Sequence, residues 1–259
     1  MNNFKKLIGA IYREIKDIFF WTKVPKGSFK NSGVSFHENF IDKELCDELK
    51  KLSDELFSNK ELLNKDSWIN ERKKETKGKV DTKVKAIFSF DKNSDKLTDF
   101  IQSNKLQSLF EKELGYELEL RNCCLQYDEP DTETKRSFHT DNNPPPSFKA
   151  FIYLTDVDET KNGPFSVIEG THTGARYLRI KNIYFNLKNN LPTSNMDKYI
   201  PNKNETPFCG KKGDLILSTQ TLFHRGNPDH SEKTRYVLIF YFSLKQYGPY
   251  PEFVLGKSS

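Results

Sequence analysis

Two residues that could bind one metal ion stand two positions apart in the sequence, His139 and Asp141. On an extended segment, residues at i and i+2 point to the same side, so this imidazole and carboxylate can hold one cation. The other histidines are His37, His172, His224 and His230. His224 follows the strand that we expect over 214–218, and we predict it as the second imidazole. Two imidazoles and one carboxylate on one face of a metal leave coordination positions open, as in non-haem Fe(II) oxygenases.

A cation at the start of an apolar strand is the second chemical signal. Arg235 opens the strand that we expect over 235–242. A guanidinium there is costly unless it meets an anion, and its planar fork suits a carboxylate. A keto acid that chelates the metal at one end and reaches Arg235 with its distal carboxylate would account for both features. Zinc would favour a closed tetrahedral set, and no fourth ligand is evident. We expect His172 to order a turn, and His37 and His230 to lie at the surface.

The second half of the chain supplies strands that could position these residues. From about residue 117 it consists of short alternating or apolar segments: ELELRNCCLQY, FKAFIYLTDV, PFSVIEG, GDLILST and RYVLIFYFSL. Residues typical of turns separate them: Asp128-Glu129-Pro130, Asn142-Asn143-Pro144, Asn162-Gly163-Pro164 and Lys212-Gly213-Asp214. Many short strands with turns between them predict an antiparallel barrel or jelly roll.

The first half reads as mainly helical, so the fold class is α+β. We expect helices over 42–57 and 96–114, strands over 33–36 and 85–90, and a loop with some helix over 58–83. The segment 235–242 is apolar on both faces, which indicates that the helices brace one outer sheet. The segment 171–212 reads as a long loop that could form a substrate lid.

Residues 4–21 have the periodicity of an amphipathic helix. Its apolar stripe comprises Leu7, Ile8, Ile11, Tyr12, Ile15, Ile18 and Phe19. The simpler interpretation is that this stripe packs on the outside of the domain. The alternative is a peripheral contact with an anionic membrane, for which the basic residues and Phe20-Trp21 would be suited. We assign 1–32 to this helix and a linker, and 33–259 to the main domain.

Composition restricts the remaining classes. A chain of 259 residues is long enough for one large domain with a substantial core. The net charge of +5 is spread over Lys-rich and Asn-rich segments, so we expect no nucleic-acid partner. The four cysteines form no CxxC pair, which fits reduced thiols and a cytoplasmic location. We find no signal peptide and no segment typical of a transmembrane helix.

These motifs together resemble the phytanoyl-CoA dioxygenase family of Fe(II)/2-oxoglutarate-dependent oxygenases. The resemblance extends from about residue 33 to residue 242. It rests on His139-Thr140-Asp141, the strand 149–156, Asn162-Gly163-Pro164-Phe165, the turn Glu169-Gly170-Thr171-His172, Gly213-Asp214, His224-Arg225-Gly226 and Arg235. The HxD pair alone is a weak signal, but this ordered combination is specific.

The resemblance implies a double-stranded β-helix, the cupin-like jelly roll, with Fe(II), 2-oxoglutarate and O2 as cofactor and co-substrates. It implies that His139, Asp141 and His224 bind iron and that Arg235 anchors 2-oxoglutarate. Further contacts with 2-oxoglutarate are expected from Lys149, Gln126 and Tyr153. Two positions depart from the family pattern. Gly226 stands where some relatives have Ser or Thr, so the Tyr153 hydroxyl could assist Arg235 instead, and Thr171 replaces a Ser.

The resulting hypothesis is a dioxygenase that hydroxylates a small-molecule substrate with release of succinate and CO2. Asp141 argues against a halogenase, in which a small residue replaces the carboxylate. The alternatives are a cupin-like metalloenzyme that does not use 2-oxoglutarate, a nucleic-acid demethylase and a non-catalytic metal-binding module.

Overall fold

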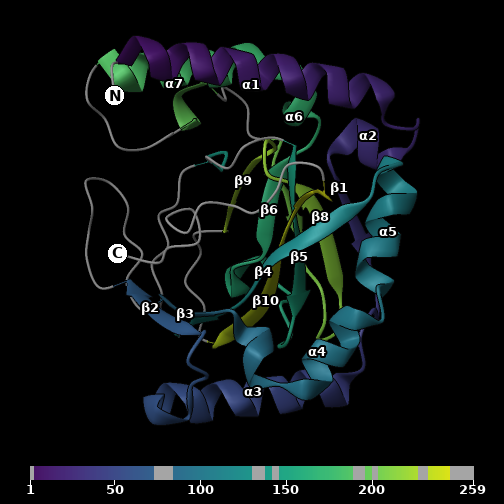
Figure 1. Cartoon of the computed structure of the whole chain (residues 1–259), viewed down its shortest axis with the longest axis vertical. Coiled ribbons are helices and arrows are strands. Elements are labelled where there is room, and N and C mark those ends of the chain that lie inside the picture. Colours follow the sequence, from purple (N-terminus) through teal and green to yellow (C-terminus); the bar gives the residue numbers. More distant parts are fainter. Residues whose placement is uncertain are drawn as a thin grey trace.

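Two antiparallel sheets form the centre of the molecule in the computed structural model (Figure 1). The structure describes residues 3–72, 84–129, 138–141, 146–188, 196–199, 204–226 and 233–245. The turn expected at residues 142–144, and His230, lie outside them. The larger sheet has the order β1 (Val34–His37), β8 (Leu215–Thr219), β5 (Ser147–Tyr153), β10 (Arg235–Leu244), β4 (Leu118–Asp128), β3 (Val84–Phe88), β2 (Trp68–Arg72). The smaller has the order β7 (Thr206–Phe208), β6 (Phe165–Ile168), β9 (Phe223–Gly226).

Helices surround these sheets (Figure 1). They are α1 (Asn3–Lys23), α2 (Ser28–Ser32), α3 (Lys43–Ser58), α4 (Asp95–Gln102), α5 (Lys105–Leu114), α6 (Thr171–Gly174) and α7 (Arg176–Lys188). Short 3-10 turns occur at Lys60–Leu62, Phe90–Asn93, Thr160–Asn162 and Asp197–Tyr199. The expected α+β fold, a jelly roll braced by helices, is confirmed.

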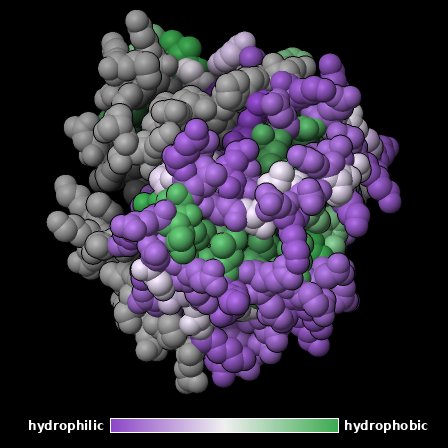
Figure 2. All heavy atoms as spheres, turned by 60° about the horizontal axis from the view of Figure 1, so that its bottom comes forward, coloured by the Kyte–Doolittle hydropathy of each residue, from purple (hydrophilic) through white to green (hydrophobic). Residues whose placement is uncertain are grey.

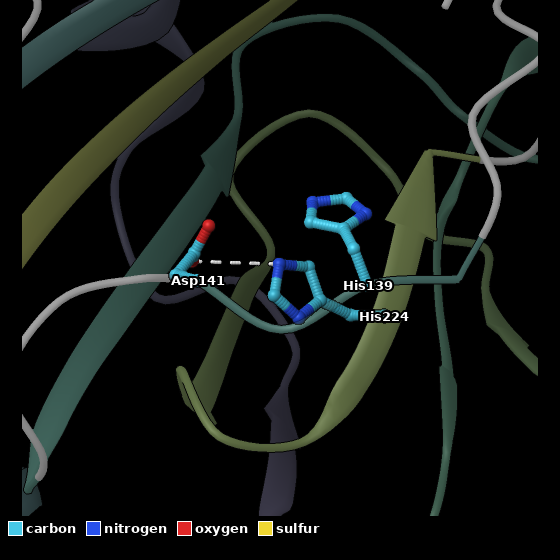
Figure 3. A group of neighbouring side chains, drawn as sticks. All are labelled: His139, Asp141 and His224. Atoms are coloured by element: carbon cyan, nitrogen blue, oxygen red, sulfur yellow. Dashed lines mark ion pairs between the residues drawn. The ribbon is translucent and has the colours of Figure 1, made fainter. Parts of the chain in front are cut away.

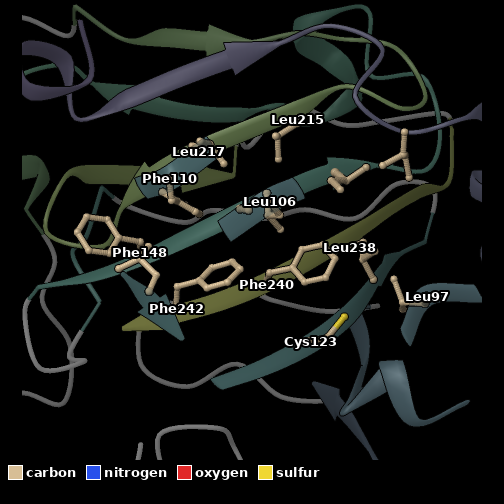
Figure 4. Packing of buried hydrophobic residues seen from close by; sticks show 14 of the residues in the cluster. Leu97, Leu106, Phe110, Cys123, Phe148, Leu215, Leu217, Leu238, Phe240 and Phe242 are labelled. Atoms are coloured by element: carbon tan, nitrogen blue, oxygen red, sulfur yellow. The ribbon is translucent and has the colours of Figure 1, made fainter. Parts of the chain in front are cut away.

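The larger sheet is buried on both faces, which explains the continuous apolar sequence of β10. Leu238 and Phe240 belong to the outer core, where the sheet packs against α3, α4 and α5 (Figure 4). Val237 and Ile239 point to the opposite face and join the core between the two sheets. Successive side chains of a strand alternate in direction, so every second residue of β10 faces the interior of the jelly roll.

Three local expectations are corrected. The segment 58–83, read as loop and helix, also contains the edge strand β2, which pairs with β3 from Trp68–Phe88 to Arg72–Val84. The single helix expected over 96–114 is two helices, because Asn104 adopts a left-handed conformation with φ of 56° between α4 and α5. Part of the segment 171–212, read as a long loop, is helical as α6 and α7.

The N-terminal helix α1 lies beside α7 along one end of the molecule (Figure 1). The helix packs on the outside of the domain, as the simpler interpretation expected, but not through its apolar stripe, in which Ile8, Ile15 and Phe19 are exposed. Phe20 and Trp21, expected at a membrane surface in the alternative, are instead buried in the outer core. Among the described residues, no helix combines the length and the apolar composition needed to cross a membrane.

At the end opposite α1, α3 begins after Asp42 as expected and buries one side of the helix, at Cys46, Leu49 and Leu56. A view that brings this end forward shows mainly hydrophilic residues, with apolar residues gathered in a band (Figure 2). The exposed residues of α3 are Lys43, Glu44, Asp47, Glu48, Lys51, Glu55 and Ser58. All are polar, as is usual for a surface helix, and in this they differ from those of α1.

Candidate metal centre

Backbone pairing brings the three predicted metal ligands together. The segment 138–141 lies antiparallel to β9, and His139 and His224 form a bridge in which each amide donates to the other's carbonyl at 3.0 Å. The Asp141 amide donates to the Gln220 carbonyl at 3.1 Å. These backbone hydrogen bonds fix residues from two distant parts of the chain at the same end of the jelly roll.

The side chains of His139, Asp141 and His224 converge (Figure 3). One ligand atom from each residue lies within 4.8 Å of the other two. The two imidazole rings are 4.5 Å apart between centroids, and His224 Nε2 lies 3.5 Å from Asp141 Oδ2. Within the described part of the chain, no other His, Cys, Asp or Glu completes this group as a fourth ligand. Three side chains on one side of a point suit a metal with open positions.

The tautomer of His224 is set by its own strand. His224 Nδ1 lies 2.8 Å from the Leu222 carbonyl oxygen. A carbonyl can only accept, so Nδ1 carries a proton, and Nε2, which faces Asp141, is the nitrogen available to a metal. This arrangement is the usual outer-shell support for a metal-binding histidine.

Asp141 is held in the charged form that a metal ligand requires. Burial opposes its ionisation, but Lys149, His224 and His139 together outweigh burial and keep the pKa of this carboxyl well below its usual range. Asp141 Oδ2 is buried, with the Lys149 ammonium 2.5 Å away and His224 Nε2 3.5 Å away. Two imidazoles and one carboxylate that is both buried and ionised fit a divalent transition metal such as Fe(II).

The residues expected to contact the co-substrate lie on strands that line the same interior. Lys149 and Tyr153 occupy inward positions of β5. Gln126 on β4 and Arg235 on β10 also occupy inward positions of their strands. The predicted inward direction of the Lys149 side chain is therefore observed. Its ammonium contacts Asp141 and also lies 5.0 Å from the centre of the Tyr241 ring.

Arg235 is paired with Asp128, a residue that the sequence analysis assigned to a turn. Asp128 instead ends β4 opposite Arg235, and Arg235 Nε donates to Asp128 Oδ2 at 2.6 Å. The Gln126 amide donates to both oxygens of the same carboxylate, at 3.0 and 3.2 Å. The position of Asp128 two residues after Gln126 was the available signal, because strand periodicity places both side chains on one face.

Tyr153 has a different set of contacts from the one expected. Its hydroxyl donates to the Phe208 carbonyl at 2.8 Å and accepts from the Phe165 amide at 3.0 Å. Burial raises the pKa of this phenol to about 12, so it stays protonated. Tyr153 thus connects β5 to β6 and β7, and its assistance to Arg235 stays a prediction.

The turn at residues 169–172 is hydrogen-bonded to β9, the strand that carries His224. The Thr171 hydroxyl donates to the Ile168 carbonyl at 2.7 Å and accepts from the Phe223 amide at 2.9 Å. The substitution of Ser by Thr therefore keeps a hydroxyl in a structural role next to His224. His172 is buried, and its Nε2 lies 3.1 Å from the Lys30 carbonyl, which agrees with its expected ordering of the turn.

Fold and site together define a class: a cupin-like double-stranded β-helix whose interior carries two histidines and one aspartate. The profile of the phytanoyl-CoA dioxygenase (PhyH) family matches residues 29–237. The chain belongs to this family, as its motifs indicated. A search of curated proteins gave no match.

Solved structures share this fold at low sequence identity. The non-haem α-ketoglutarate-dependent carbocyclase SnoK from nogalamycin biosynthesis has 13% identity and a TM-score of 0.62, over 86% of this chain and 85% of SnoK. EctD from S. alaskensis with bound Fe has 17% identity and a TM-score of 0.61, over 90% and 84%. HygX from Streptomyces hygroscopicus with nickel and 2-oxoglutarate has 14% identity and a TM-score of 0.59, over 86% and 87%.

Proposed function

We propose that this protein is an Fe(II)- and 2-oxoglutarate-dependent dioxygenase that hydroxylates a small molecule and releases succinate and CO2. The observation that carries the proposal is that the triad His139, Asp141 and His224 shares one interior with the cation Arg235. Membership of the PhyH family supports it. So do similar folds that were solved with bound iron, or with nickel and 2-oxoglutarate.

The side chains of this chain have distinct roles in that reaction. His139, Asp141 and His224 would hold the metal on one side and leave the other side free. When bound, Fe(II) with 2-oxoglutarate supplies dioxygen activation and the oxidising power for a C–H bond. Arg235 would bind the distal carboxylate of 2-oxoglutarate through its fork, with Asp128 fixing the orientation of the guanidinium.

The walls beside the triad are apolar and would limit the access of water. Phe165 on β6 stacks on Phe151 of β5 at 4.3 Å between centroids, and its ring is 5.5 Å from His224. Low polarity strengthens the electrostatic attraction of Arg235 and Lys149 for an anionic co-substrate. Lys149 is proposed as a second contact with 2-oxoglutarate once a metal replaces it at Asp141.

An anaerobic titration of the protein with Fe(II) and 2-oxoglutarate tests this function. A weak visible charge-transfer band of the chelate is expected in the wild type and absent in His139→Ala. Arg235→Lys keeps the charge but loses the fork, so it should shift the 2-oxoglutarate dependence to higher concentration. Lys245→Ala, an exposed change at a residue paired with Glu117, serves as the control and should behave as the wild type.

Turnover of 2-oxoglutarate is a second, independent measure of the proposed activity. Succinate formation from 2-oxoglutarate under air, with and without candidate small molecules, should depend on Fe(II) and on His224. A folded, metal-loaded protein that gives neither the band nor succinate would contradict the proposal. That result would favour a cupin-like metalloenzyme that does not use 2-oxoglutarate, or a non-catalytic metal-binding module.

A further inference from the structure

The outward side of α1 is apolar. Its exposed large apolar side chains, with their exposed fractions, are Phe4 (66%), Ile8 (51%), Ile11 (38%), Tyr12 (57%), Ile15 (45%), Ile18 (43%) and Phe19 (64%). Residues three, four and seven positions apart lie on one face of a helix. These side chains therefore form one continuous apolar strip along a helix of 21 residues, which is about 31 Å long.

The inward side of α1 is charged, which is the reverse of an ordinary surface helix. Glu14 and Asp17 are buried against Arg179 of α7, itself only 3% exposed. Arg179 Nε and Nη2 donate to the two oxygens of Glu14 at 2.8 and 2.7 Å. Arg176 Nη2 lies 3.4 Å from Asp17 Oδ2.

These contacts fix the rotation of α1 about its axis. If the helix turned its apolar strip inward, Arg179 would lose both bonds to Glu14 and become a buried uncompensated charge, which is strongly unfavourable. Phe20 and Trp21 would also leave the outer core. Trp21 additionally donates from Nε1 to Asp17 Oδ1 at 3.1 Å. Rotation of α1 therefore cannot bury the apolar strip against the described part of the chain without loss of the α1–α7 contact.

The charges that remain on the outward surface of α1 are positive. Its two acidic residues are the buried Glu14 and Asp17, whereas Lys16 and Lys23 are exposed. Lys16 and Lys23 are seven positions apart, so they lie on one flank of the strip. An apolar strip beside cations is complementary to an anionic lipid surface. A second copy of α1 on the same strip would bring like charges together.

We propose that α1 docks on an anionic phospholipid surface. It would lie in the plane of the membrane with its isoleucines and Phe19 inserted below the headgroups, and Lys16 and Lys23 would contact lipid phosphates. The α1–α7 ion pairs would hold the rest of the protein on the aqueous side. This surface is separate from the metal site, so its docking does not depend on the proposed catalytic function.

Vesicle binding tests this proposal with the full-length protein. The wild type should sediment with vesicles of phosphatidylcholine and phosphatidylglycerol, and much less with phosphatidylcholine alone or at high salt. Ile8→Gln/Ile15→Gln should lower the partition coefficient at least about tenfold, because two large apolar side chains no longer leave water. Lys16→Gln/Lys23→Gln should remove the preference for the anionic lipid.

Controls make the outcome specific to α1. Leu62 is 60% exposed in a different part of the molecule, so Leu62→Gln removes a comparable exposed apolar group and should leave vesicle binding unchanged. A Phe19→Trp variant should show a blue-shifted emission increment on vesicles, because Trp at that position enters an apolar environment. Thermal unfolding should match the wild type in these surface variants, which excludes a folding defect.

Two results would overturn the proposal. One is equal binding of the wild type and Ile8→Gln/Ile15→Gln to anionic vesicles. The other is absence of vesicle binding by a protein that sediments as a dimer and becomes a monomer in the same variant, which would assign the strip to a second copy of the chain. Neither result would alter the Fe(II) and 2-oxoglutarate titration, so the two proposals fail independently.

Discussion

The ammonium of Lys149 on β5 lies 2.5 Å from Oδ2 of Asp141, so the carboxylate of the candidate metal centre is paired with a cation. Both side chains are largely buried. A divalent metal at the triad must share Asp141 with this ammonium or displace it. We therefore expect Lys149 to stabilise the metal-free site, to oppose metal binding and to be available to an anionic co-substrate.

Replacement of Lys149 by Met should separate these two effects. The affinity for Co(II) or Mn(II) without 2-oxoglutarate should increase at least about tenfold, because a like charge is removed from a low-polarity site. The KM for 2-oxoglutarate should increase instead. Calorimetric metal titration and succinate assays measure the two quantities, with Lys245→Met as control. Weaker metal binding in Lys149→Met would contradict this account.

Gly226 offers a test of the co-substrate end of the site. A Cβ built on Gly226 lies 3.9 Å from Nη2 of Arg235 with no closer neighbour, so a small side chain fits there. Gly226→Ser should lower the KM for 2-oxoglutarate a few-fold, since an added hydrogen bond contributes about 1 kcal/mol. Gly226→Ala adds the Cβ without the hydroxyl and should leave KM near the wild-type value. Equal effects of Ser and Ala would exclude a hydroxyl contribution.

The buried ion pair of α1 and α7 should respond strongly to the loss of one partner. Arg179 also donates to the carbonyls of Thr171, His172 and Thr221. Arg179→Met leaves Glu14 buried without a counter-charge and should cost roughly 3–5 kcal/mol in unfolding free energy. The double variant Glu14→Leu/Arg179→Met should recover part of this loss. A double-mutant cycle by urea unfolding measures the coupling, and additive single effects would show that the two residues are independent.

Stability should depend on pH through His172. Burial lowers the pKa of this imidazole from 6.5 to about 4, because its Nδ1 is buried without a hydrogen-bond partner. The unfolded chain binds a proton near pH 6.5 and the folded chain does not, so the contribution of His172 is complete above that pH. It is lost as the pH falls towards 4, by roughly 3 kcal/mol.

The comparison of wild type with His172→Gln isolates this effect. Asp17 changes the stability in the opposite direction with pH. Burial raises the pKa of its carboxyl to about 6, although Arg179 and Arg176 act to lower it. Its ionisation therefore reduces stability as the pH rises towards 6. The difference in unfolding free energy between wild type and His172→Gln cancels Asp17 and should decrease between pH 7 and pH 4.5. A difference independent of pH would show that the pKa of His172 is the same in the folded and the unfolded chain.

Local chemistry of the sequence was sufficient to predict much of the site. The spacing of His139 and Asp141, the later His224 and the alternation that directs Lys149 inward are properties of short segments, and the structure brings them together. The expected Gly at the end of the 96–114 helical region is also found, with Gly115 at φ of 72°. Strand periodicity and turn chemistry operate over a few residues, so the sequence alone specified these features.

Pairings between distant segments were decided only by the tertiary structure. Asp128 looked like a turn residue until the register of β4 with β10 placed it opposite Arg235. The apolar strip of α1 looked like a core-facing stripe, because the periodicity of a helix does not specify which side meets the protein. Arg179 of α7 decided this by binding Glu14 and Asp17. A buried guanidinium is tolerated only when its acidic partners are present. The ion pairs therefore keep Glu14 and Asp17 on the inward side of α1, and its apolar side faces outward.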